Sequence, residues 1–214
     1  MKIRYFDHAG ATPVRPEVLE AMWPYFADKF GNPSAVYDLG AAVKDAIEEQ
    51  RAKVAALVGA EAKNIIFTSS GAEANNLAIK GVCLARQGKG RQVIVSAIEH
   101  HSVLNAARYL EKFHDFEATF LPVDCYGLVD PERLAKALTP ATVLVSIQHA
   151  SNEIGTIQAI KQLAAVCRQA EVLFHTDAIA TAGTVPLNVE ELGVDLLSIN
   201  GPALAGPKGI GALY

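Results

Sequence analysis

Three side chains that could bind a ligand or move a proton follow predicted strands. His100 offers an imidazole, which can stack on a flat ring or cap a helix. Asn152 offers an amide, and Asp177 offers a carboxylate directly after a predicted buried strand. The carboxyl ends of parallel strands are where open α/β sheets bind ligands, so we expect these side chains to lie near one another. Taken singly, each is more often a turn or cap residue.

A fourth stretch, residues 67–76, passes from a predicted strand through Gly71 and Ala72 into a predicted helix. Small residues at a helix N-terminus let backbone N–H groups approach an anion, and the helix dipole favours phosphate there. Such junctions are usually only turns, so both interpretations stay open. The sequence contains no P-loop and no helix-opening Gly-x-Gly-x-x-Gly, so nothing favours ATP or a dinucleotide.

The spacing of histidines and cysteines argues against a metal centre. His100 and His101 are adjacent, but no His-x-x-x-His or Cys-x-x-Cys pair supports them. Cys83 and Cys167 fall in apolar helical patterns typical of small core residues, and Cys125 falls in a predicted turn. We therefore predict no metal site and no disulfide framework.

Short β-branched runs alternate with helical patterns from residue 64 onward. Apolar residues at three- and four-residue spacing predict the helices, as at Ile160, Leu163 and Cys167. Asp130, followed by a proline, is typical of the N-cap of a helix that runs through residue 138. The alternation predicts an α/β fold with a mostly parallel seven-stranded sheet sandwiched by helices. Its predicted strands are residues 64–68, 92–96, 118–122, 142–147, 172–175, 194–198 and 210–214.

A helical arm precedes this unit. One helix is predicted over residues 16–26, interrupted near Pro24, and a longer one over residues 38–58, with Gly59 as its stop. The longer helix carries an apolar stripe of Leu39, Val43, Ile47, Val54 and Leu57. We expect an N-terminal arm over residues 1–60 and an α/β domain over 61–214. Because the sequence stops on an apolar strand, we also expect that this chain lacks a C-terminal domain.

Composition narrows the classes of partner. The chain has 214 residues, a net charge of -4 and 50% hydrophobic residues. The length and the hydrophobic fraction suit one sizeable core. The mild negative charge argues against nucleic-acid binding, which needs a clustered excess of Lys and Arg. No apolar run reaches the roughly 18 residues of a membrane span, and the N-terminus lacks the apolar core of a signal peptide. We expect a cytoplasmic protein that binds neither nucleic acid nor a membrane.

Longer motifs span nearly the whole chain. They are Phe6-Asp7, Ala11-Thr12-Pro13-Val14, Phe30-Gly31-Asn32-Pro33-Ser34, Phe67-Thr68-Ser69-Ser70-Gly71-Ala72-Glu73, Glu99-His100, Leu121-Pro122-Val123-Asp124, Ser151-Asn152-Glu153-Ile154-Gly155-Thr156, His175-Thr176-Asp177-Ala178 and the C-terminal Gly206-Pro207-Lys208-Gly209-Ile210-Gly211-Ala212-Leu213-Tyr214. With these motifs the sequence resembles the cysteine desulfurases of the class V aminotransferase family, fold-type I enzymes that use pyridoxal phosphate. The resemblance implies L-cysteine as substrate and a place in sulfur mobilisation and iron–sulfur cluster assembly.

The resemblance also implies a role for each candidate residue. Gly71 and Ala72 match backbone donors to the cofactor phosphate, and Asn152 matches a contact to the ring's phenolic oxygen. His100 matches the catalytic imidazole that stacks on the pyridine ring and shuttles protons. Asp177 matches the carboxylate that pairs with the pyridine nitrogen. An ionised Asp there keeps the nitrogen protonated, and a pyridinium ring is a strong electron sink.

The chain departs from the family pattern where the cofactor is held covalently. The family's Schiff-base lysine falls at Ala203, its phosphate-binding histidine at Pro202 and its phosphate-binding serine at Asn200. A glutamine that reaches the cofactor falls at Ala180. The sulfur-accepting cysteine and the substrate-carboxylate arginine belong to a C-terminal region that this sequence lacks. Lys208 belongs to a separate Gly-Pro-Lys-Gly element, so we expect it not to replace the missing amine.

Two functions stay open at this point. A desulfurase-type protein would bind pyridoxal phosphate non-covalently through Asp177, His100 and Asn152. Its activity would be impaired or dependent on a partner, because Ala203 offers no amine. The alternative is a non-catalytic scaffold or partner subunit of the same family, a pseudoenzyme. In both cases we expect a homodimer, or a complex with a chain that supplies the missing C-terminal domain.

Overall fold

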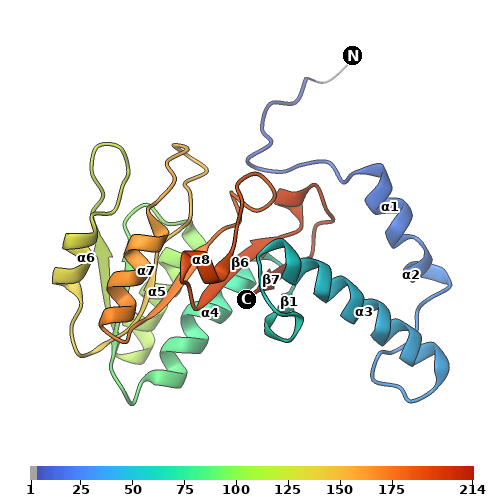
Figure 1. Ribbon diagram of the computed structural model, residues 1–214, viewed down its shortest axis with the longest axis horizontal. Coiled ribbons are helices and arrows are strands. Elements are labelled where there is room, and N and C mark those ends of the chain that lie inside the picture. Colours follow the sequence, from blue (N-terminus) through green and yellow to red (C-terminus); the bar gives the residue numbers. More distant parts are fainter. Residues whose placement is uncertain (1–3) are drawn as a thin grey trace.

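A single sheet of seven strands organises the protein, in the order β1-β7-β6-β5-β4-β2-β3 (Figure 1). The computed structural model describes residues 4–214, so residues 1–3 of the predicted arm lie outside the described part. Four neighbouring pairs are parallel, and β7 pairs antiparallel with both β1 and β6. The predicted mostly parallel sheet is confirmed. Its strands are β1 Ile66–Thr68, β2 Gln92–Ser96, β3 Glu117–Leu121, β4 Thr142–Ser146, β5 Leu173–Asp177, β6 Leu196–Asn200 and β7 Gly211–Leu213.

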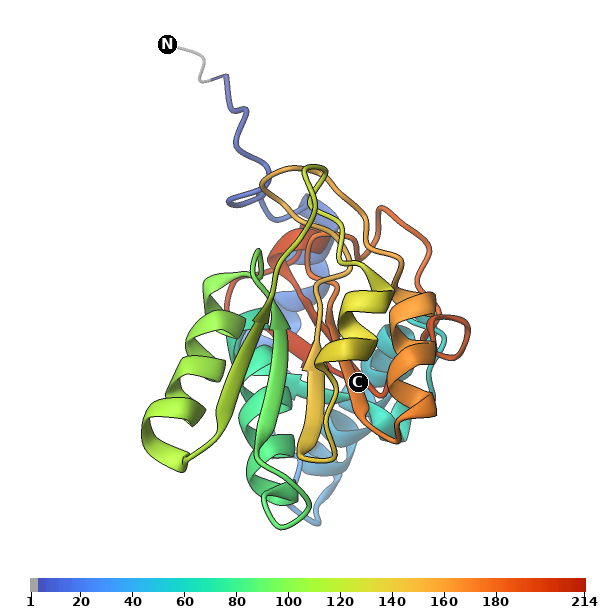
Figure 2. The same ribbon diagram turned by 90° about the vertical axis from the view of Figure 1, so that its left-hand side faces the viewer.

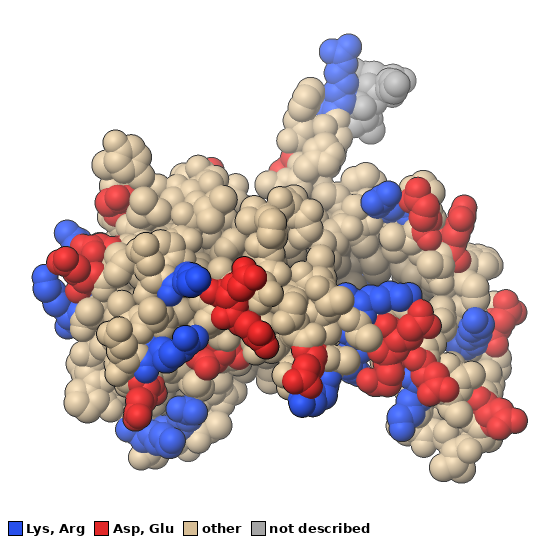
Figure 3. Space-filling model, in the orientation of Figure 1, with Lys and Arg blue, Asp and Glu red and all other residues tan. Residues whose placement is uncertain are grey.

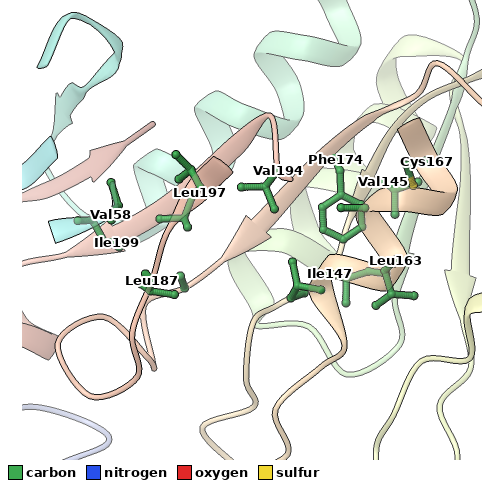
Figure 4. Close-up of a cluster of buried hydrophobic side chains, with 14 of the residues drawn as sticks. Val58, Val145, Ile147, Leu163, Cys167, Phe174, Leu187, Val194, Leu197 and Ile199 are labelled. Atoms are coloured by element: carbon green, nitrogen blue, oxygen red, sulfur yellow. The ribbon is translucent and has the colours of Figure 1, made fainter. Parts of the chain in front are cut away.

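Helices cover both faces of the sheet (Figure 2). One face carries α4 Gly71–Arg86 and α5 His101–His114, and the other carries α6 Pro131–Ala137, α7 Ile160–Gln169 and α8 Val189–Leu192. Alternate side chains of each strand face opposite layers, so Val93 belongs to the α4–α5 cluster and Ile94 to the α7 cluster. Figure 4 shows part of the α7 cluster, where Phe174 lies near Leu163.

The cysteine predictions agree with this core. Cys83 and Cys167 are fully buried, as expected of small core residues, and Cys125 is exposed. Glu99 and Asp177 are the only buried acidic residues of residues 4–214, and no lysine or arginine there is buried. In the view of Figure 3, lysines and arginines on the surface are interspersed with acidic residues. None of the helices within residues 4–214 has the length and apolar character needed to cross a membrane.

The N-terminal arm projects from the sheet as three helices, α1 Pro16–Met22, α2 Pro24–Ala27 and α3 Asp38–Leu57 (Figure 1). The predicted interruption near Pro24 is confirmed, and Gly59 adopts the positive φ of 67° expected just past the end of α3. The helices α1 and α2 contain no buried residue. None of the five residues of the predicted α3 stripe is fully buried: Leu57 is exposed, the other four are half-buried, and Val54 packs against the core of the sheet. A domain boundary at residue 60 stays a prediction.

Several predicted element boundaries differ from the structure, and strand pairing explains the two that bear on the site. Asp177 does not follow its strand but is the last residue of β5, because it pairs with Ser198 of β6. β6 in turn runs to Asn200, two residues past its predicted end, because Asn200 pairs with Gly211. β1 begins at Ile66, two residues after its predicted start, because a 3-10 turn occupies Ala62–Asn64. Both strand extensions carry polar side chains up to the sheet edge where the site lies.

Candidate functional site

A cavity of about 820 Å³ lies at the carboxyl ends of the parallel strands. That volume is within the range of small-molecule sites. All five residues singled out from the sequence line it: Gly71, Ala72, His100, Asn152 and Asp177. They come from α4, from the loops after β2 and β4, and from the end of β5. Parallel pairing therefore brings together side chains that are far apart in the sequence.

The start of α4 is built to leave two backbone donors at this cavity. The Ser70 hydroxyl accepts from the Glu73 N–H at 3.1 Å, and the Glu73 carboxylate accepts from the Ser69 N–H. These reciprocal bonds cap the helix. A Cβ at Gly71 would lie 2.2 Å from Cδ1 of Ile179, so a larger residue there would require the Ile179 side chain to move. Within residues 4–214, the N–H groups of Gly71 and Ala72 donate to no acceptor.

Asp177 is the buried charge of the site, with 6% of its surface exposed. Its Oδ2 accepts from Nδ2 of Asn75 at 2.7 Å, and its Oδ1 accepts from the backbone N–H of Ile179 at 3.0 Å. Burial raises the pKa of this carboxyl, against the lowering effects of both hydrogen bonds and of the nearby His100. No lysine, arginine or histidine of residues 4–214 forms an ion pair with it.

A hydrogen-bonded chain connects His100 to Asp177. Nδ1 of His100 lies 2.8 Å from the Ser102 hydroxyl and accepts from the Ser102 N–H at 3.1 Å. Nδ2 of Asn75 donates to the same hydroxyl at 2.9 Å and to Asp177. Because Nδ1 is an acceptor, the neutral ring carries its proton on Nε2. Sequence reasoning gave no role to Asn75 or Ser102.

Asn152 lies at the rim of the cavity and is exposed. Its loop turns at Gly155, which has a positive φ of 75°, and a β-bridge between Ala150 and Ile157 closes the loop. The side-chain amide donates only weakly to Glu153, at 3.4 Å between Nδ2 and Oε1. The Asn152 amide is therefore available to a ligand.

The four departures from the family pattern also line the cavity: Asn200, Pro202, Ala203 and Ala180. Oδ1 of Asn200 accepts from the backbone N–H of Ala203 at 2.9 Å, so this side chain supports the turn that carries Ala203. No lysine or arginine is among the lining residues that the structure describes. Lys208 is not a lining residue, and its Nζ donates to the carbonyl oxygen of Thr12 at 2.6 Å.

The N-terminal segment contributes a wall that sequence reasoning missed. His8 and Thr12 line the cavity together with the small residues between them. The Thr12 hydroxyl donates to the carbonyl oxygen of Pro202, and the Arg15 N–H donates to that of Ala205. The only signal for this wall was the Ala11-Thr12-Pro13-Val14 motif, whose spacing does not indicate where the segment folds back.

The remaining histidines of the candidate stretches lie outside the cavity lining. His149 is buried, with Nδ1 2.9 Å from the Thr181 hydroxyl, and burial lowers its pKa. His175 is buried between the hydroxyls of Ser146 and Ser198, and burial lowers its pKa to about 3. The described part of the chain holds no cluster of three or more metal-ligating side chains.

Comparison with known proteins places this geometry in a family. Residues 4–214 match the model of the family described as aminotransferase class-V. The chain belongs to the aminotransferase class-V family. The matched residues include both the candidate ring-binding residues of the cavity and the loop that carries Ala203.

Several relatives of this chain are named as cysteine desulfurases. The chain is 53% identical to cysteine desulfurase IscS of Dictyoglomus turgidum and 49% identical to that of Methanosarcina thermophila. These matches cover 98% and 100% of this chain but 53% and 52% of the relatives, so the chain spans about half their length. A solved structure described as SspA in complex with cysteine superposes with a TM-score of 0.96 at 39% identity, covering 99% of this chain and 61% of that one.

Members of the aminotransferase class-V family use pyridoxal phosphate, and the cavity fits one part of that group. The unpaired buried carboxylate of Asp177 suits a cationic ring nitrogen, and the free N–H groups of Gly71 and Ala72 suit a phosphate. The fit fails at the aldehyde end. There Ala203 and its neighbours present no amine, so the cavity matches ring recognition and lacks covalent attachment.

Proposed function

We propose that this chain binds pyridoxal phosphate non-covalently and belongs to a protein that mobilises sulfur from L-cysteine. The supporting observation is Asp177, a buried carboxyl with a raised pKa and no cationic partner in residues 4–214. A buried unpaired carboxylate is costly. A protonated ring nitrogen would remove that cost, and the described lining residues include no lysine or arginine to do so.

Each residue of the cavity has a defined task in this proposal. When bound, the cofactor supplies a pyridinium ring that withdraws electrons from its substituents. Asp177 keeps the ring nitrogen protonated, and Asn75 keeps Asp177 in place. His100 presents the proton on Nε2, since Ser102 engages Nδ1. Asn152 binds the ring's phenolic oxygen, and the N–H groups of Gly71 and Ala72 bind the phosphate.

The same cavity limits the chemistry. Ala203 cannot retain the cofactor as an imine, and Pro202 has no side-chain donor for the phosphate. Each charge-assisted hydrogen bond to such a dianion is worth about 1.5–3 kcal/mol. We therefore expect weak cofactor binding and an activity that is impaired or depends on a partner.

Exposed aromatic side chains on the arm support a partner. Trp23, Phe26 and Phe30 are each about 70% exposed, at 71%, 72% and 70%. Clustered apolar side chains of this size mark interaction surfaces. We propose that a second copy of the chain, or a chain that supplies a C-terminal domain, covers them. We also propose a cytoplasmic location for the complex.

The second candidate function is a non-catalytic subunit of the same family. It is favoured by the co-occurrence of Ala203, Pro202 and Ala180 in the cavity lining, because together they remove covalent and phosphate contacts. The two functions differ in one assay. A desulfurase produces alanine and persulfide from L-cysteine with pyridoxal phosphate present, and a scaffold does not.

Equilibrium binding tests the main proposal. The purified chain is titrated with pyridoxal phosphate and followed by absorbance, with Asp177→Asn as the site variant. Asp195→Asn is the control, since Asp195 lies at the amino end of β6, away from the cavity. We expect saturable binding that Asp177→Asn weakens and Asp195→Asn preserves. Equal binding by all three proteins would contradict the proposal.

A further inference from the structure

Glu99 lies beside the site and contributes no side chain to the cavity lining. It follows β2 by three residues and is only 5% exposed. Its Oε1 accepts two hydrogen bonds, from the Ser96 hydroxyl at 2.5 Å and from the backbone N–H of Gln148 at 2.8 Å. Ser96 ends β2, and Gln148 follows β4 by two residues. One carboxyl oxygen thus joins the ends of two neighbouring parallel strands.

A second contact reinforces this joint. Nε2 of Gln148 donates to the carbonyl oxygen of Ile98 at 2.9 Å, so the two loops are tied in both directions. The loop after β2 continues directly into His100. The loop after β4 continues through Gln148, which lines the cavity, to Asn152. Glu99 therefore sits where it fixes the relative position of two site residues.

The second carboxyl oxygen of Glu99 indicates whether the side chain is protonated. Oε2 of Glu99 is buried and has no hydrogen-bond partner among residues 4–214. An ionised carboxylate oxygen left unpaired in the interior is strongly disfavoured, whereas a protonated one is not. The two bonds to Oε1 suit the carbonyl oxygen of a neutral acid, with the proton on Oε2.

The surroundings favour the neutral form as well. Burial raises the pKa of Glu99 to about 8, opposed by the hydrogen bonds from Ser96 and Gln148 and reinforced by the negative charge of Asp177. The nearby histidines do not reverse this: His100 is exposed, and burial keeps the pKa of His149 low. With Glu99 neutral, Asp177 is the one buried carboxyl of residues 4–214 left to carry a negative charge.

We propose that Glu99 is a positioning residue: a neutral carboxylic acid that locks the ends of β2 and β4 together and so holds His100 and Asn152 at the cavity. The inference rests on the proposed function for what is held there. The protonation state and the clamp can be tested without any cofactor.

The first experiment measures unfolding by urea for the wild-type chain and Glu99→Gln between pH 5 and pH 8. Glutamine mimics the neutral acid, accepts both bonds at its carbonyl oxygen and does not titrate. The folded state retains a proton that the unfolded state releases above about pH 4.3. The stability that the protonated Glu99 contributes to the wild-type chain is therefore fully present below that pH and is lost as the pH rises toward 8. The ratio of the two unfolding constants should change about tenfold per pH unit.

Glu111→Gln, on the exposed surface of α5, is the control and should show no such slope. A wild-type to Glu99→Gln ratio that stays constant with pH would overturn the inference. It would mean that Glu99 is already ionised in the folded protein.

The second experiment measures pyridoxal phosphate binding by the same proteins and by Glu99→Ala. Glu99→Gln should match wild type at pH 7 and retain the ligand above pH 8, where the wild type loses affinity. Glu99→Ala should bind more weakly at every pH. Equal loss in the Gln and Ala variants would overturn the positioning role. If no protein binds the cofactor, the proposed function fails, and the unfolding experiment alone decides the protonation of Glu99.

Discussion

The ε-amine of Lys208 donates a 2.6 Å hydrogen bond to the carbonyl oxygen of Thr12, 196 positions earlier in the chain. This bond ties the end of the Ala203 loop to the N-terminal segment that lines the cavity. It also directs the amine toward a backbone oxygen and not toward the ligand space. Lys208 therefore has a structural partner, and the cavity gains no amine from it.

We predict that Lys208 does not form a covalent bond with pyridoxal phosphate. After incubation and borohydride reduction, peptide mass spectrometry should find the peptide that contains Lys208 unmodified. A specific, stoichiometric adduct on Lys208 would show that the loop rearranges on binding. Lys63, exposed and distant from the cavity, serves as the control for non-specific labelling of surface lysines.

Asp177→Asn should weaken cofactor binding and at the same time stabilise the free protein. Burial raises the folded-state pKa of Asp177, so the stability contributed by its protonated form is lost as pH rises. The amide has no charge to bury. Its NH₂ group can donate to Oδ1 of Asn75, which has no partner in residues 4–214, once the Asn75 amide turns. Urea unfolding at neutral pH measures the gain, and a less stable variant would contradict this account of Asp177.

Asn75→Ala should destabilise the chain by about 1–3 kcal/mol, because it leaves a buried carboxylate oxygen of Asp177 without its donor. Asn76→Ala is the matched control. It is one position along α4 and donates to backbone carbonyl oxygens only, so it should cost about 0.5 kcal/mol. Similar losses in the two variants, measured by denaturant unfolding, would argue against the His100–Asp177 chain.

The general arrangement of the site could be predicted from sequence because it depends on strand ends. His100, Asn152 and Asp177 follow or end β-branched runs, and parallel pairing leaves them no other edge to occupy. Asn75 could not be found this way. An asparagine one turn into an amphipathic helix suggests a polar face, and only the packing of α4 over β5 turns it toward Asp177.

Long-range contacts account for what else was missed. The N-terminal wall depends on bonds such as that of Thr12 to Pro202, 190 positions apart, which no local pattern contains. The α3 stripe was read correctly as apolar, but local periodicity cannot say whether anything covers it. Glu99 was visible only as part of a motif, since its burial follows from the joint between β2 and β4.

His175 should make the fold sensitive to acid. Its folded pKa of about 3 lies below the unfolded value of about 6.5, so its stability contribution is present above pH 6.5 and lost as pH falls toward 3. Relative to His175→Asn, the wild-type unfolding constant should rise up to about tenfold per pH unit on acidification through that window. The unfolding constant of the exposed His101→Asn variant should change with pH as that of the wild type does. If the unfolding constant of His175→Asn also followed the wild type, the prediction would be contradicted.

The central claim is that the cavity recognises the pyridoxal phosphate ring and lacks the amine that would hold the cofactor covalently. The most direct measurement compares the wild-type chain with Ala203→Lys after incubation with pyridoxal phosphate, borohydride reduction and peptide mass spectrometry. We predict a stoichiometric phosphopyridoxyl adduct on residue 203 of the variant, none at a specific site of the wild type, and loss of the adduct when Asp177→Asn is added. An Ala203→Lys chain that stays unlabelled while folded, or a wild-type chain labelled at one site within the cavity, would contradict the account.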